Sequence, residues 1–498
     1  MRVLRCIFLF FLMSGAMCIR GQDYPVSLFG IKSDGSTLNT RSIQFAIDYI
    51  NSQGGGRLVF SVGRYLTGSI HLKSNVTLRI EEGAVLLGSL NPFDYDREIY
   101  TALISGTNEH HIGITGKGVI DGQGRQVALD ILTLIHSGIV KDPLVHDRPN
   151  EAIRPMLINF LSCENVTIKN ITLKNAASWV ETYNQCKAVQ IDSIVVDSKA
   201  YWNNDGVDLV DCDSVQVTNS YIDAADDGIC LKSHDDKKVC QHIWVMHNTI
   251  RSSASAIKFG TASYGGFRHV RIIDNRVFDT YRSALALEAV DGGFIEDVEI
   301  DSLNASHTGN ALFLRIGQRV GKRKSRLQNV TINNLSAEIA ANKPDSGYEY
   351  EGPIEDQPRN ISPIVITGLP DAFIENISLR NVSVHFPGAG NAEYAKTLLS
   401  ELDNIPELPT KYPEFSMFGE LPAWGLYIRH ARNIICTNLL LSCAKKDYRT
   451  AIVLDDVHDS NFSPVTLYEP DNKKGLFLYR SSAVTSKYEV LPKSGKIP

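Results

Sequence analysis

The sequence predicts an all-β, right-handed parallel β-helix with a capping helix at its N-terminal end. From residue 70 onward, short runs rich in β-branched residues, such as "NVTIKNITLKN" and "HVRIIDNRVFD", return at intervals of roughly 20 to 30 residues. Each run alternates apolar and polar positions, which is the period of a strand. Gly, Asn and Asp stand between the runs, where the coils of a solenoid turn. No change of composition marks a second domain, so we expect one domain over residues 22–498.

Residues 1–21 have the pattern of an export signal. Two arginines precede the apolar run "CIFLFFLM", and small residues follow it. The run is too short to span a bilayer, so we expect no transmembrane span. We expect cleavage between Met17 and Gln22 and an exported protein, periplasmic or extracellular; a lipid anchor at Cys18 is the alternative.

The segment "TRSIQFAIDYINSQGGG" predicts the helix that closes the first coil. Ile43, Ala46, Ile47 and Ile50 form an apolar stripe with i, i+3, i+4, i+7 spacing, and Gly54–Gly56 end the helix. An open terminal coil would expose its core and its strand edges, so a cap is needed there.

Asparagines recur at the ends of the strand runs, many of them in N-x-S/T triplets. Stacked coils would bring these amides into hydrogen-bonded ladders, and we favour that interpretation over glycosylation, for which the strands leave little room. Toward the C-terminus, residues 404–422 are rich in proline and aromatic residues and predict a long ordered loop over the sheets. We expect loops at 125–155 and 400–422 to wall a groove.

Charge and cysteine usage narrow the class of partner. A net charge of −6 gives no electrostatic reason to expect a nucleic acid. Seven cysteines follow the signal, and neither this odd number nor their spacing indicates a disulfide framework or a zinc site. Buried free thiols are the favoured interpretation; pairing of Cys230 with Cys240, or of Cys436 with Cys443, is the alternative.

Acidic residues recur one coil apart. "WNNDGVDLV" and "DAADDGICLKS" place Asp226 and Asp227 at 21 and 22 residues after Asp205. Adjacent strands are about 4.8 Å apart, so the carboxyl groups should lie within roughly 5 to 9 Å of one another. An inverting glycosidase needs a protonated carboxyl and a carboxylate about 6.5 to 9.5 Å apart. Acids that lie close together do not all ionise at the same pH, so one of them keeps its proton near neutral pH. The alternatives are a tight Asp-Asp-Gly turn and a Ca²⁺ site.

At these residues the sequence resembles the polygalacturonase family, glycoside hydrolase family 28, whose members hydrolyse galacturonide linkages in pectins. The resemblance runs from "FGIKSDGS" through "GKGVIDGQG", "NNDGVDL" and "DDGICLKS" to "PAWGLYIRH". It implies that Asp226 is the general acid and that Asp205 and Asp227 hold and deprotonate the attacking water, with inversion. It also implies no metal and no organic cofactor. Asp208 is expected to order the turn, and Asn203–Asp205 match the family's Asn-Thr-Asp motif.

Two other motifs of that family are absent. Ala254–Ala256 stand where Gly-His-Gly is expected, and Ala286–Glu288 stand where Arg-Ile-Lys is expected. The usual means of holding a galacturonate carboxylate is therefore missing. Lys258 either supplies the lost positive charge to the substrate or pairs with Glu288, about one coil later.

Other side chains keep two interpretations open. Arg315 and Arg319 either grip a sugar carboxylate or form ion pairs with the acidic groove. Trp179, Trp202 and Trp424 either stack on sugar rings or fill the core. The candidate substrate-binding residues are Asn203, Lys232, His234, Ser255, Lys258, Glu288 and Arg315.

Together these features predict a monomeric enzyme that hydrolyses α-D-galacturonide linkages of pectic polysaccharide or oligogalacturonides by single displacement. The missing motifs favour an exo-acting enzyme or one directed at a rhamnogalacturonan-type chain. The alternatives are Ca²⁺-dependent β-elimination, as in pectate lyases, and a non-catalytic glycan-binding β-helix.

Overall fold

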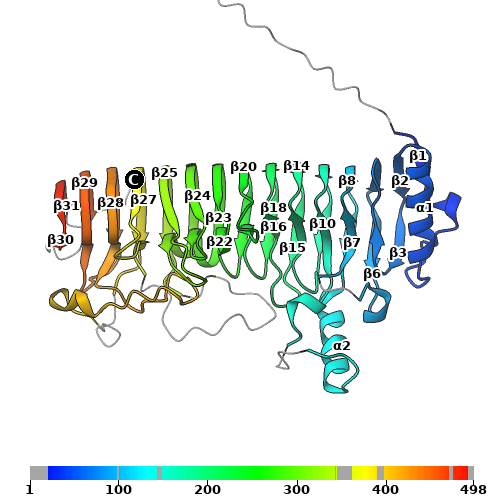
Figure 1. Cartoon of the computed structure of the whole chain (residues 1–498), viewed down its shortest axis with the longest axis horizontal. Helices are drawn as coiled ribbons and strands as arrows, with labels where there is room; N and C mark the ends of the chain where they lie inside the picture. The colour runs from blue at the N-terminus through cyan, green and yellow to red at the C-terminus, as the bar shows by residue number, and fades with distance from the viewer. Residues whose placement is uncertain are drawn as a thin grey trace, which may run out of the picture.

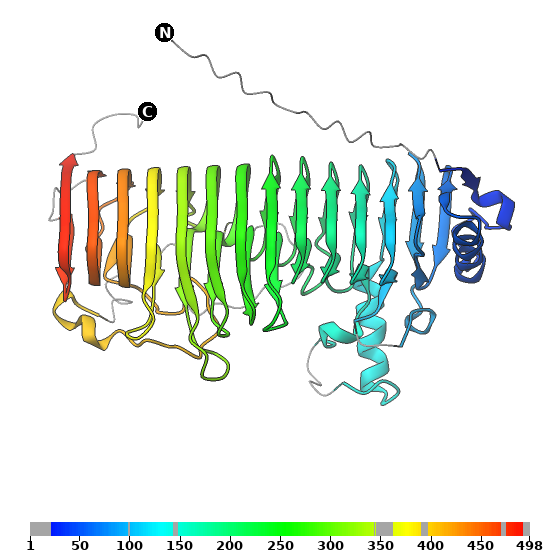
Figure 2. The same ribbon diagram turned by 45° about the horizontal axis from the view of Figure 1, so that its top comes forward.

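Residues of each coil pair in parallel with those one coil before and one coil after, and this pairing builds the β-helix that the sequence predicts. The computed structural model describes residues 21–97, 100–142, 148–342, 344, 362–389, 397–469 and 475–491. The predicted signal peptide lies outside the described residues, except for Gly21. The strands stack along one axis, from α1 (Thr40–Ser52) to β31 (Ser482–Leu491), as Figures 1 and 2 show.

Three ladders of parallel strands run along this axis. The first contains β4 (Ile70–His71), β7 (Ala102–Thr107), β10 (Met156–Leu161), β13 (Glu181–Asn184), β16 (Val207–Val210), β19 (Ile229–Ser233), β22 (Ile257–Ser263), β26 (Ile364–Thr367) and β30 (Leu476–Tyr479). The second contains β1 (Asp23–Pro25), β2 (Gly56–Phe60), β5 (Val76–Ile80), β8 (His110–Thr115), β11 (Glu164–Lys169), β14 (Lys187–Asp192), β17 (Asp213–Thr218) and β20 (Cys240–Met246). The third contains β3 (Gly63–Thr67), β6 (Ala84–Gly88), β9 (Val119–Asp121), β12 (Thr172–Lys174), β15 (Val195–Ser198), β18 (Tyr221–Ala224) and β21 (Thr249–Ser252).

Later coils use longer strands that continue through the corners. Four of them contribute to all three ladders: β23 (Phe267–Ala289), β24 (Phe294–Ile316), β28 (Ala423–Cys443) and β29 (Thr450–Tyr468). The second and third ladders also contain β25 (Arg326–Ile339), β27 (Ile374–Phe386) and β31. Short 3-10 helices lie between strands: η1 (Val26–Phe29), η2 (Pro92–Asp94), η3 (Glu151–Ile153) and η5 (Leu399–Asn404).

The corners carry the asparagine ladders that the sequence predicts. Asn438 donates its amide to Asn381 (3.0 Å), Asn381 donates to Asn334 (3.1 Å), and Asn334 donates to Asp301 (2.9 Å). The three asparagines have left-handed backbone angles, with φ between 53 and 55°. Asn tolerates this conformation better than most residues, so one residue type serves both the turn and the ladder.

The interior of the solenoid is apolar and holds the thiols. All seven described cysteines are free and buried, which confirms the expected interpretation over a disulfide framework. Trp424 belongs to this core, with its indole N–H donating to Glu469 (3.0 Å), so it fills the interior and does not stack on sugar.

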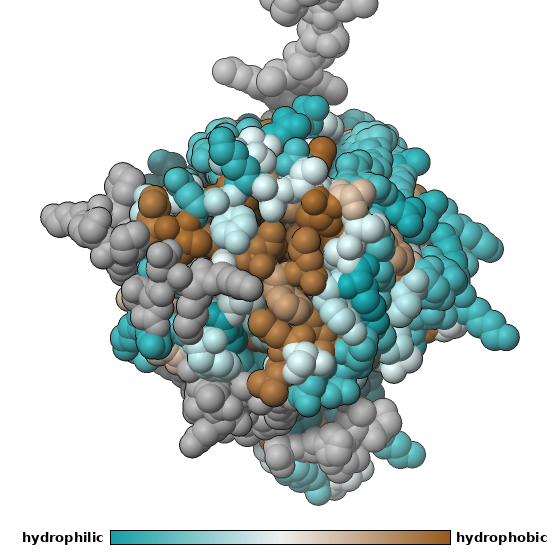
Figure 3. Space-filling view, turned by 90° about the vertical axis from the view of Figure 1, so that its left-hand side faces the viewer, coloured by the Kyte–Doolittle hydropathy of each residue, from teal (hydrophilic) through white to brown (hydrophobic). Residues whose placement is uncertain are grey.

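The two ends of the solenoid differ. At the N-terminal end α1 buries the predicted stripe of Ile43, Ala46, Ile47 and Ile50 against the first coil. At the other end, no helix follows β30 and β31 among the described residues, and Figure 3 shows apolar residues gathered at the centre of that face. None of the helices in the described part of the chain has the length and apolar character needed to cross a membrane.

Two insertions project from the same side of the solenoid, as Figures 1 and 2 show. The first contains α2 (Gly124–His136), so the prediction of a loop over 125–155 is wrong for this segment. The second, residues 399–421, contains η5 and the predicted ordered loop. Its apolar side chains pack on the outer face of the first ladder between β23 and β29: Leu402, Ile405, Phe415, Met417 and Leu421 lie against Ala286, Phe313, Val365, Tyr427 and Val453.

Candidate active site

The first ladder differs from a simple amphipathic sheet because its outward-facing side chains are also buried. Every residue of β16 and β19 is buried, whereas burial alternates along the exposed strand β11. Polar groups on this face therefore lie in a medium of low dielectric constant and must be paired. The predicted acids stand just before these buried strands.

Coil stacking brings Asp205 and Asp227 together. The backbone N–H of Gly206 donates to the carbonyl of Asp227 (2.8 Å), so a coil step of 22 residues aligns the two positions. A carboxylate oxygen of Asp205, one of Asp227 and the Cys230 sulfur lie within 4.8 Å of one another. Asp226 precedes Asp227 and accepts its backbone N–H (3.0 Å).

Lys232 on β19 lies between two buried carboxylates. Its ammonium donates to Asp205 (2.8 Å) and also contacts Asp208. Asp208 is fully buried within β16, so the expectation that it orders a turn is wrong. Burial raises the pKa of Asp208 well above its usual value although Lys232 opposes this shift. Burial also raises the pKa of Asp205, and Lys232 opposes this shift too. One ammonium serves two carboxyls, and the stronger shift at Asp208 favours a proton there.

Lys258 on β22 forms the second charged centre. Its ammonium is 3.1 Å from Asp227 and 3.9 Å from Glu288, and it donates to the Tyr412 hydroxyl (3.1 Å). The predicted Lys258–Glu288 pairing is therefore present, but Asp227 lies nearer. Burial raises the pKa of Glu288 to about 7, which Lys258 only partly offsets.

Asp226 has different neighbours. Burial and the negative charges of Asp205 and Asp227 raise its pKa to about 7, and the more weakly opposing cations are Arg282 and Lys258. Arg282 forms an ion pair with Glu414 of the 399–421 insertion (3.0 Å). Near neutral pH the carboxyl of Asp226 therefore retains a large share of its proton.

Asp227 has the opposite tendency. Burial acts to raise its pKa, but Lys258, Lys232 and Arg282 together lower it below the usual value. The backbone N–H of Ser255 also donates to its carboxylate (3.0 Å). The cluster thus holds a proton donor and an ionised base side by side, which is the arrangement that acid-and-base hydrolysis requires.

The acids are poorly suited to the alternative role of a Ca²⁺ site. Lys232 and Lys258 lie 2.8 and 3.1 Å from the carboxylates that would bind the cation. Their positive charges already compensate Asp205 and Asp227, and a divalent ion would be repelled by both ammonium groups.

The other candidates from the sequence lie around this cluster. The Asn203 side chain accepts from the buried Arg154 (2.7 Å), which fixes the turn before Asp205. Ser255 contacts Asp227 through its backbone. His234 lines a cleft next to Lys232, and burial followed by the charge of Lys232 lowers its pKa.

Arg315 lies away from the acids and beneath the insertion. Its guanidinium is 1% exposed and donates to the carbonyls of Glu407, Leu408 and Gly368. We therefore assign it to the support of residues 399–421 and correct the expectation of a sugar contact. Arg319 forms a bidentate ion pair with Asp291 (2.9 and 2.8 Å), the second of its two expected roles.

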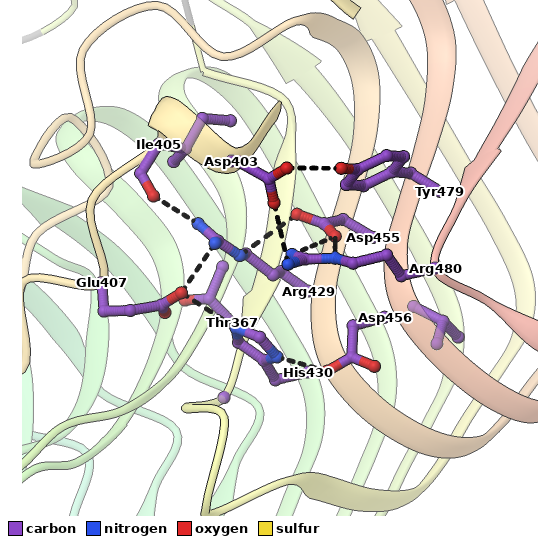
Figure 4. A network of polar contacts seen from close by, with 12 residues as sticks. Thr367, Asp403, Ile405, Glu407, Arg429, His430, Asp455, Asp456, Tyr479 and Arg480 are labelled. Atoms are coloured by element: carbon purple, nitrogen blue, oxygen red, sulfur yellow. Dashed lines mark hydrogen bonds and ion pairs between the residues drawn. The ribbon is translucent and has the colours of Figure 1, made fainter. Parts of the chain in front are cut away.

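The same insertion is held from below by a polar network, drawn in Figure 4. Arg429 on β28 donates to the carbonyl of Ile405 (2.7 Å) and pairs with Glu407 (2.7 Å) and Asp455 (3.1 Å). His430 contacts Glu407 from the other side (3.0 Å). These contacts fix one end of the segment whose other end reaches Lys258 and Arg282.

A cleft of roughly 340 Å³ opens on the N-terminal side of the cluster. Trp179 lines it, and the Lys232 ammonium lies 4.2 Å from the centre of the indole ring. Tyr100 stacks on Trp179 with ring centres 6.4 Å apart. Trp202 instead lies under the guanidinium of Arg148 (4.6 Å).

Sequence reasoning missed three residues of the site. Arg282 could have been found from the coil period, because it stands two coil steps of 28 residues after Asp226, with position 254 between them. The structure has this alignment, since the backbone N–H of Arg282 donates to the carbonyl of Ala254 (2.8 Å). Tyr412 and Glu414 belong to the insertion, which has no repeat. Its sequence offers no signal that these two side chains reach the acids.

Comparison with known proteins relates the chain to pectin-degrading hydrolases. A family model described as "Glycosyl hydrolases family 28" matches residues 57–254. A "Probable polygalacturonase" from Vitis vinifera is 26% identical over 452 residues, which cover 83% of this chain and 86% of that protein. An exo-poly-alpha-D-galacturonosidase from Dickeya chrysanthemi is 26% identical over 319 residues, with 54% and 52% coverage. The solved structure of a family 28 exopolygalacturonase from Yersinia enterocolitica has the same fold, with a TM-score of 0.64 at 19% identity and coverage of 95% of this chain and 79% of that one.

Proposed function

The chain belongs to glycoside hydrolase family 28 and is a polygalacturonase-type glycosidase, and from that premise we propose that it removes units from chain ends of pectic polysaccharide by inverting hydrolysis of α-D-galacturonide linkages. One observation carries the proposal. The three acids of adjacent coils meet on a buried face, where the pKa of Asp226 is raised to about 7 while that of Asp227 is lowered.

The reaction follows from these protonation states. Asp226 donates its proton to the glycosidic oxygen as the bond from that oxygen to C1 breaks. A water molecule held by Asp205 and Asp227 loses a proton to this carboxylate pair, and its oxygen bonds to C1 from the opposite face. Asp226 loses one proton to the leaving oxygen and the carboxylate pair gains one from the water, so charge balances, and the configuration at C1 inverts.

The exo-acting part of the proposal is supported by the shape of the groove. Residues 399–421 cover the outer face of the first ladder on the C-terminal side of the acids, and Tyr412 of this segment reaches Lys258. The cleft on the N-terminal side stays open. A sugar chain can therefore extend from the cluster in one direction only, which favours cleavage near its end.

We also propose that the enzyme acts outside the cytoplasm, in the periplasm or beyond the cell. The support is the charged, then apolar, then small-residue order of the first 21 residues. Mass analysis of the protein recovered from its host would give an N-terminus near Gln22 if the proposal holds, and an unprocessed Met1 would contradict it.

Product analysis tests the reaction. The native enzyme is incubated with polygalacturonate and with rhamnogalacturonan fragments, and the products are separated by size while proton NMR follows the anomeric signal. We expect monomer or dimer to accumulate from the start, with the β-anomer formed first. An early spread of long oligomers contradicts exo action, first formation of the α-anomer contradicts inversion, and an unsaturated product absorbing in the ultraviolet indicates β-elimination.

A variant pair tests the acid. Asp226→Asn should lower kcat at least about 100-fold, since a general acid contributes that much or more. The control is Asp274→Asn, an exposed carboxylate at a corner of the second ladder that pairs with His247. Unaltered turnover in Asp226→Asn on every pectic fraction would overturn the mechanism. Glycan binding without turnover by the native protein would favour a non-catalytic role.

A further inference from the structure

The cleft beside the catalytic cluster continues the outer face of the first ladder toward the N-terminal end. Outward-facing residues pair strand by strand, from His71 to Ser105, from Ser105 to Asn159, and from Asn159 to Thr182. The next partner of Thr182 is Asp208, which is buried beneath Lys232. Four strands span three spacings of about 4.8 Å, roughly 14 Å in all, so the row is long enough for more than one sugar unit.

The aromatic side of the cleft suits a pyranose ring. Trp179 lines it at the catalytic end, and Tyr100, which is 48% exposed, extends the same wall. The two rings stack with their planes inclined by 26°, so both aromatic side chains lie together at the cleft. Sugar sites combine such aromatic rings with a few polar side chains, which Asn159 and Thr182 supply here.

The charge of the cleft is the unexpected feature. Among the described residues that line it there is no lysine and no arginine, and Asp96 contributes a carboxylate. His71 pairs with Asp96 (3.3 Å) and Ser105 (2.7 Å), and the lowered pKa of His234 disfavours the charged form of that ring. The Lys232 ammonium lies over the Trp179 ring and is already engaged with Asp205 and Asp208.

We propose that this cleft binds uncharged pyranose units, so that the enzyme selects pectic chains whose galacturonate at the scissile bond is followed by a sugar without a free carboxylate. The proposal rests on the proposed hydrolase function and specifies its substrate. Free polygalacturonate would bring a carboxylate against Asp96 without a cation to receive it, and like charges facing each other are disfavoured. The uncharged unit has two chemical sources: a neutral sugar such as rhamnose in an alternating backbone, or a methyl-esterified galacturonate.

Binding to a turnover-deficient enzyme tests the selectivity. Asp226→Asn is titrated at pH 7 and fixed ionic strength with three tetrasaccharides: tetragalacturonate, its methyl ester, and one that alternates rhamnose with galacturonate. We expect at least one uncharged-unit ligand to bind at least about fivefold more tightly than tetragalacturonate. The tighter of the two identifies the source. Equal or tighter binding of tetragalacturonate overturns the proposal.

Two further substitutions test whether the difference in affinity arises in the cleft. Trp179→Ala in the same background should weaken the favoured ligand at least about fivefold, while Trp244→Ala, on β20 of the second ladder, should not change its affinity. Asp96→Asn should strengthen tetragalacturonate binding at least about twofold and leave the favoured ligand unchanged. Circular dichroism confirms that each variant is folded, and an absence of either effect in folded protein overturns the assignment.

The outcomes separate this inference from the proposed function. If the native enzyme hydrolyses pectic chains but Trp179→Ala and Asp96→Asn leave its preference unaltered, the cleft assignment fails and the hydrolase remains. If the uncharged-unit ligand binds as expected but the native enzyme cleaves no pectic fraction, the proposed function fails and the binding site remains.

Discussion

Asp226 and Asp227 are neighbours in the sequence, yet their surroundings move their pKa values in opposite directions. Asp227 is buried and Asp226 is half-buried, and the loss of solvent acts to raise both pKa values. Lys258, which lies 3.1 Å from Asp227, outweighs burial there only together with Lys232 and Arg282, whereas Asp226 is influenced more strongly by the negative charges of Asp205 and Asp227. The acid and the base are thus assigned by the balance of nearby charges rather than by residue type.

The pH dependence of kcat follows from these shifts. Asp226 must be protonated to act, so activity should fall about tenfold per pH unit once the pH exceeds about 7, the pKa to which Asp226 is raised. Asp227 must be ionised, and its lowered pKa keeps it so down to strongly acidic pH. We therefore expect the highest kcat on the mildly acidic side, measured by reducing-end release between pH 4 and pH 9.

Arg282 provides an internal check on this pH profile. Its positive charge lowers the pKa of Asp226, so Arg282→Gln should move the alkaline limb to higher pH without creating a new one. A kcat that rises from pH 6 to pH 8 in the native enzyme would contradict the assignment of Asp226 as the acid.

For individual residues, the sequence predicted those neighbours that the length of one coil determines. Asp205 and Asp227 stand one step of 22 residues apart, and the structure brings them together as the period requires. The partners of the acids were not predictable in the same way. Lys258 was expected to contact Glu288 or substrate, but its nearer contact with Asp227 depends on how far a flexible side chain folds back, which spacing does not determine.

Among the structural elements, the 399–421 insertion links the catalytic cluster to the C-terminal coils. Tyr412 and Glu414 contact Lys258 and Arg282 at one end, and Glu407 binds Arg429 at the other. Composition predicted an ordered loop here but not its contacts, because an irregular segment has no period from which neighbours can be computed.

The helix α2 shows a different limit of prediction. Val127, Ala128, Ile131 and Ile135 are buried on one face, and this stripe is visible in the sequence. The strand-repeat pattern stops at this insertion, and the absence of a repeat led to the prediction of a loop. Helical periodicity has to be sought separately within each insertion of a solenoid.

Loosening the insertion should change the product pattern. Arg429→Met removes the guanidinium that joins Ile405, Glu407 and Asp455. The buried Asp455 then keeps its ion pair with Arg480 but loses the one with Arg429, which should lower the free energy of unfolding by about 3 to 5 kcal/mol. We expect a lower Tm and, below that Tm, a wider range of oligosaccharide products from polygalacturonate, because the wall beside the acids is no longer held. Product sizes are measured by anion-exchange chromatography.

Arg432→Met is the matched control for this change. Arg432 lies on the same strand, β28, but it is half-exposed; it pairs with Glu375 at the surface (3.5 Å) and lies over the Phe373 ring. Its loss should change stability by less than about 1 kcal/mol and leave the products unaltered. If Arg429→Met lowers the Tm but yields the same products as the native enzyme, the insertion does not determine where the chain is cut.

In the whole molecule, each coil is stabilised mainly by the coils next to it. Each described strand pairs only with strands of the coils before and after it, so strand pairing joins neighbouring coils alone, and the 399–421 insertion adds contacts across several coils. The catalytic coils lie near the middle of the axis, where both neighbours are present, and the terminal coils depend on a cap or remain open. Sequence reasoning anticipated this architecture well, because one repeated pattern specifies every coil.

The cap offers a test of this nearest-neighbour coupling. Ile47→Ala removes a fully buried side chain of α1 and should destabilise the first coils by about 2 to 5 kcal/mol. In hydrogen exchange followed by mass spectrometry, we expect protection to fall in β1, β2 and β3 and to stay near the native level in β16, β19 and β22. Catalysis below the unfolding temperature should be unaffected, since the acids lie several coils away.

Phe45→Ala is the control, because Phe45 lies on the same helix but is 62% exposed. It should change exchange in the first coils far less than Ile47→Ala does. A uniform loss of protection from β1 to β29 in Ile47→Ala would mean that the solenoid unfolds as one cooperative unit. In that case the cap would stabilise the catalytic coils directly, and a change at one end of the molecule would alter the acid cluster in the middle.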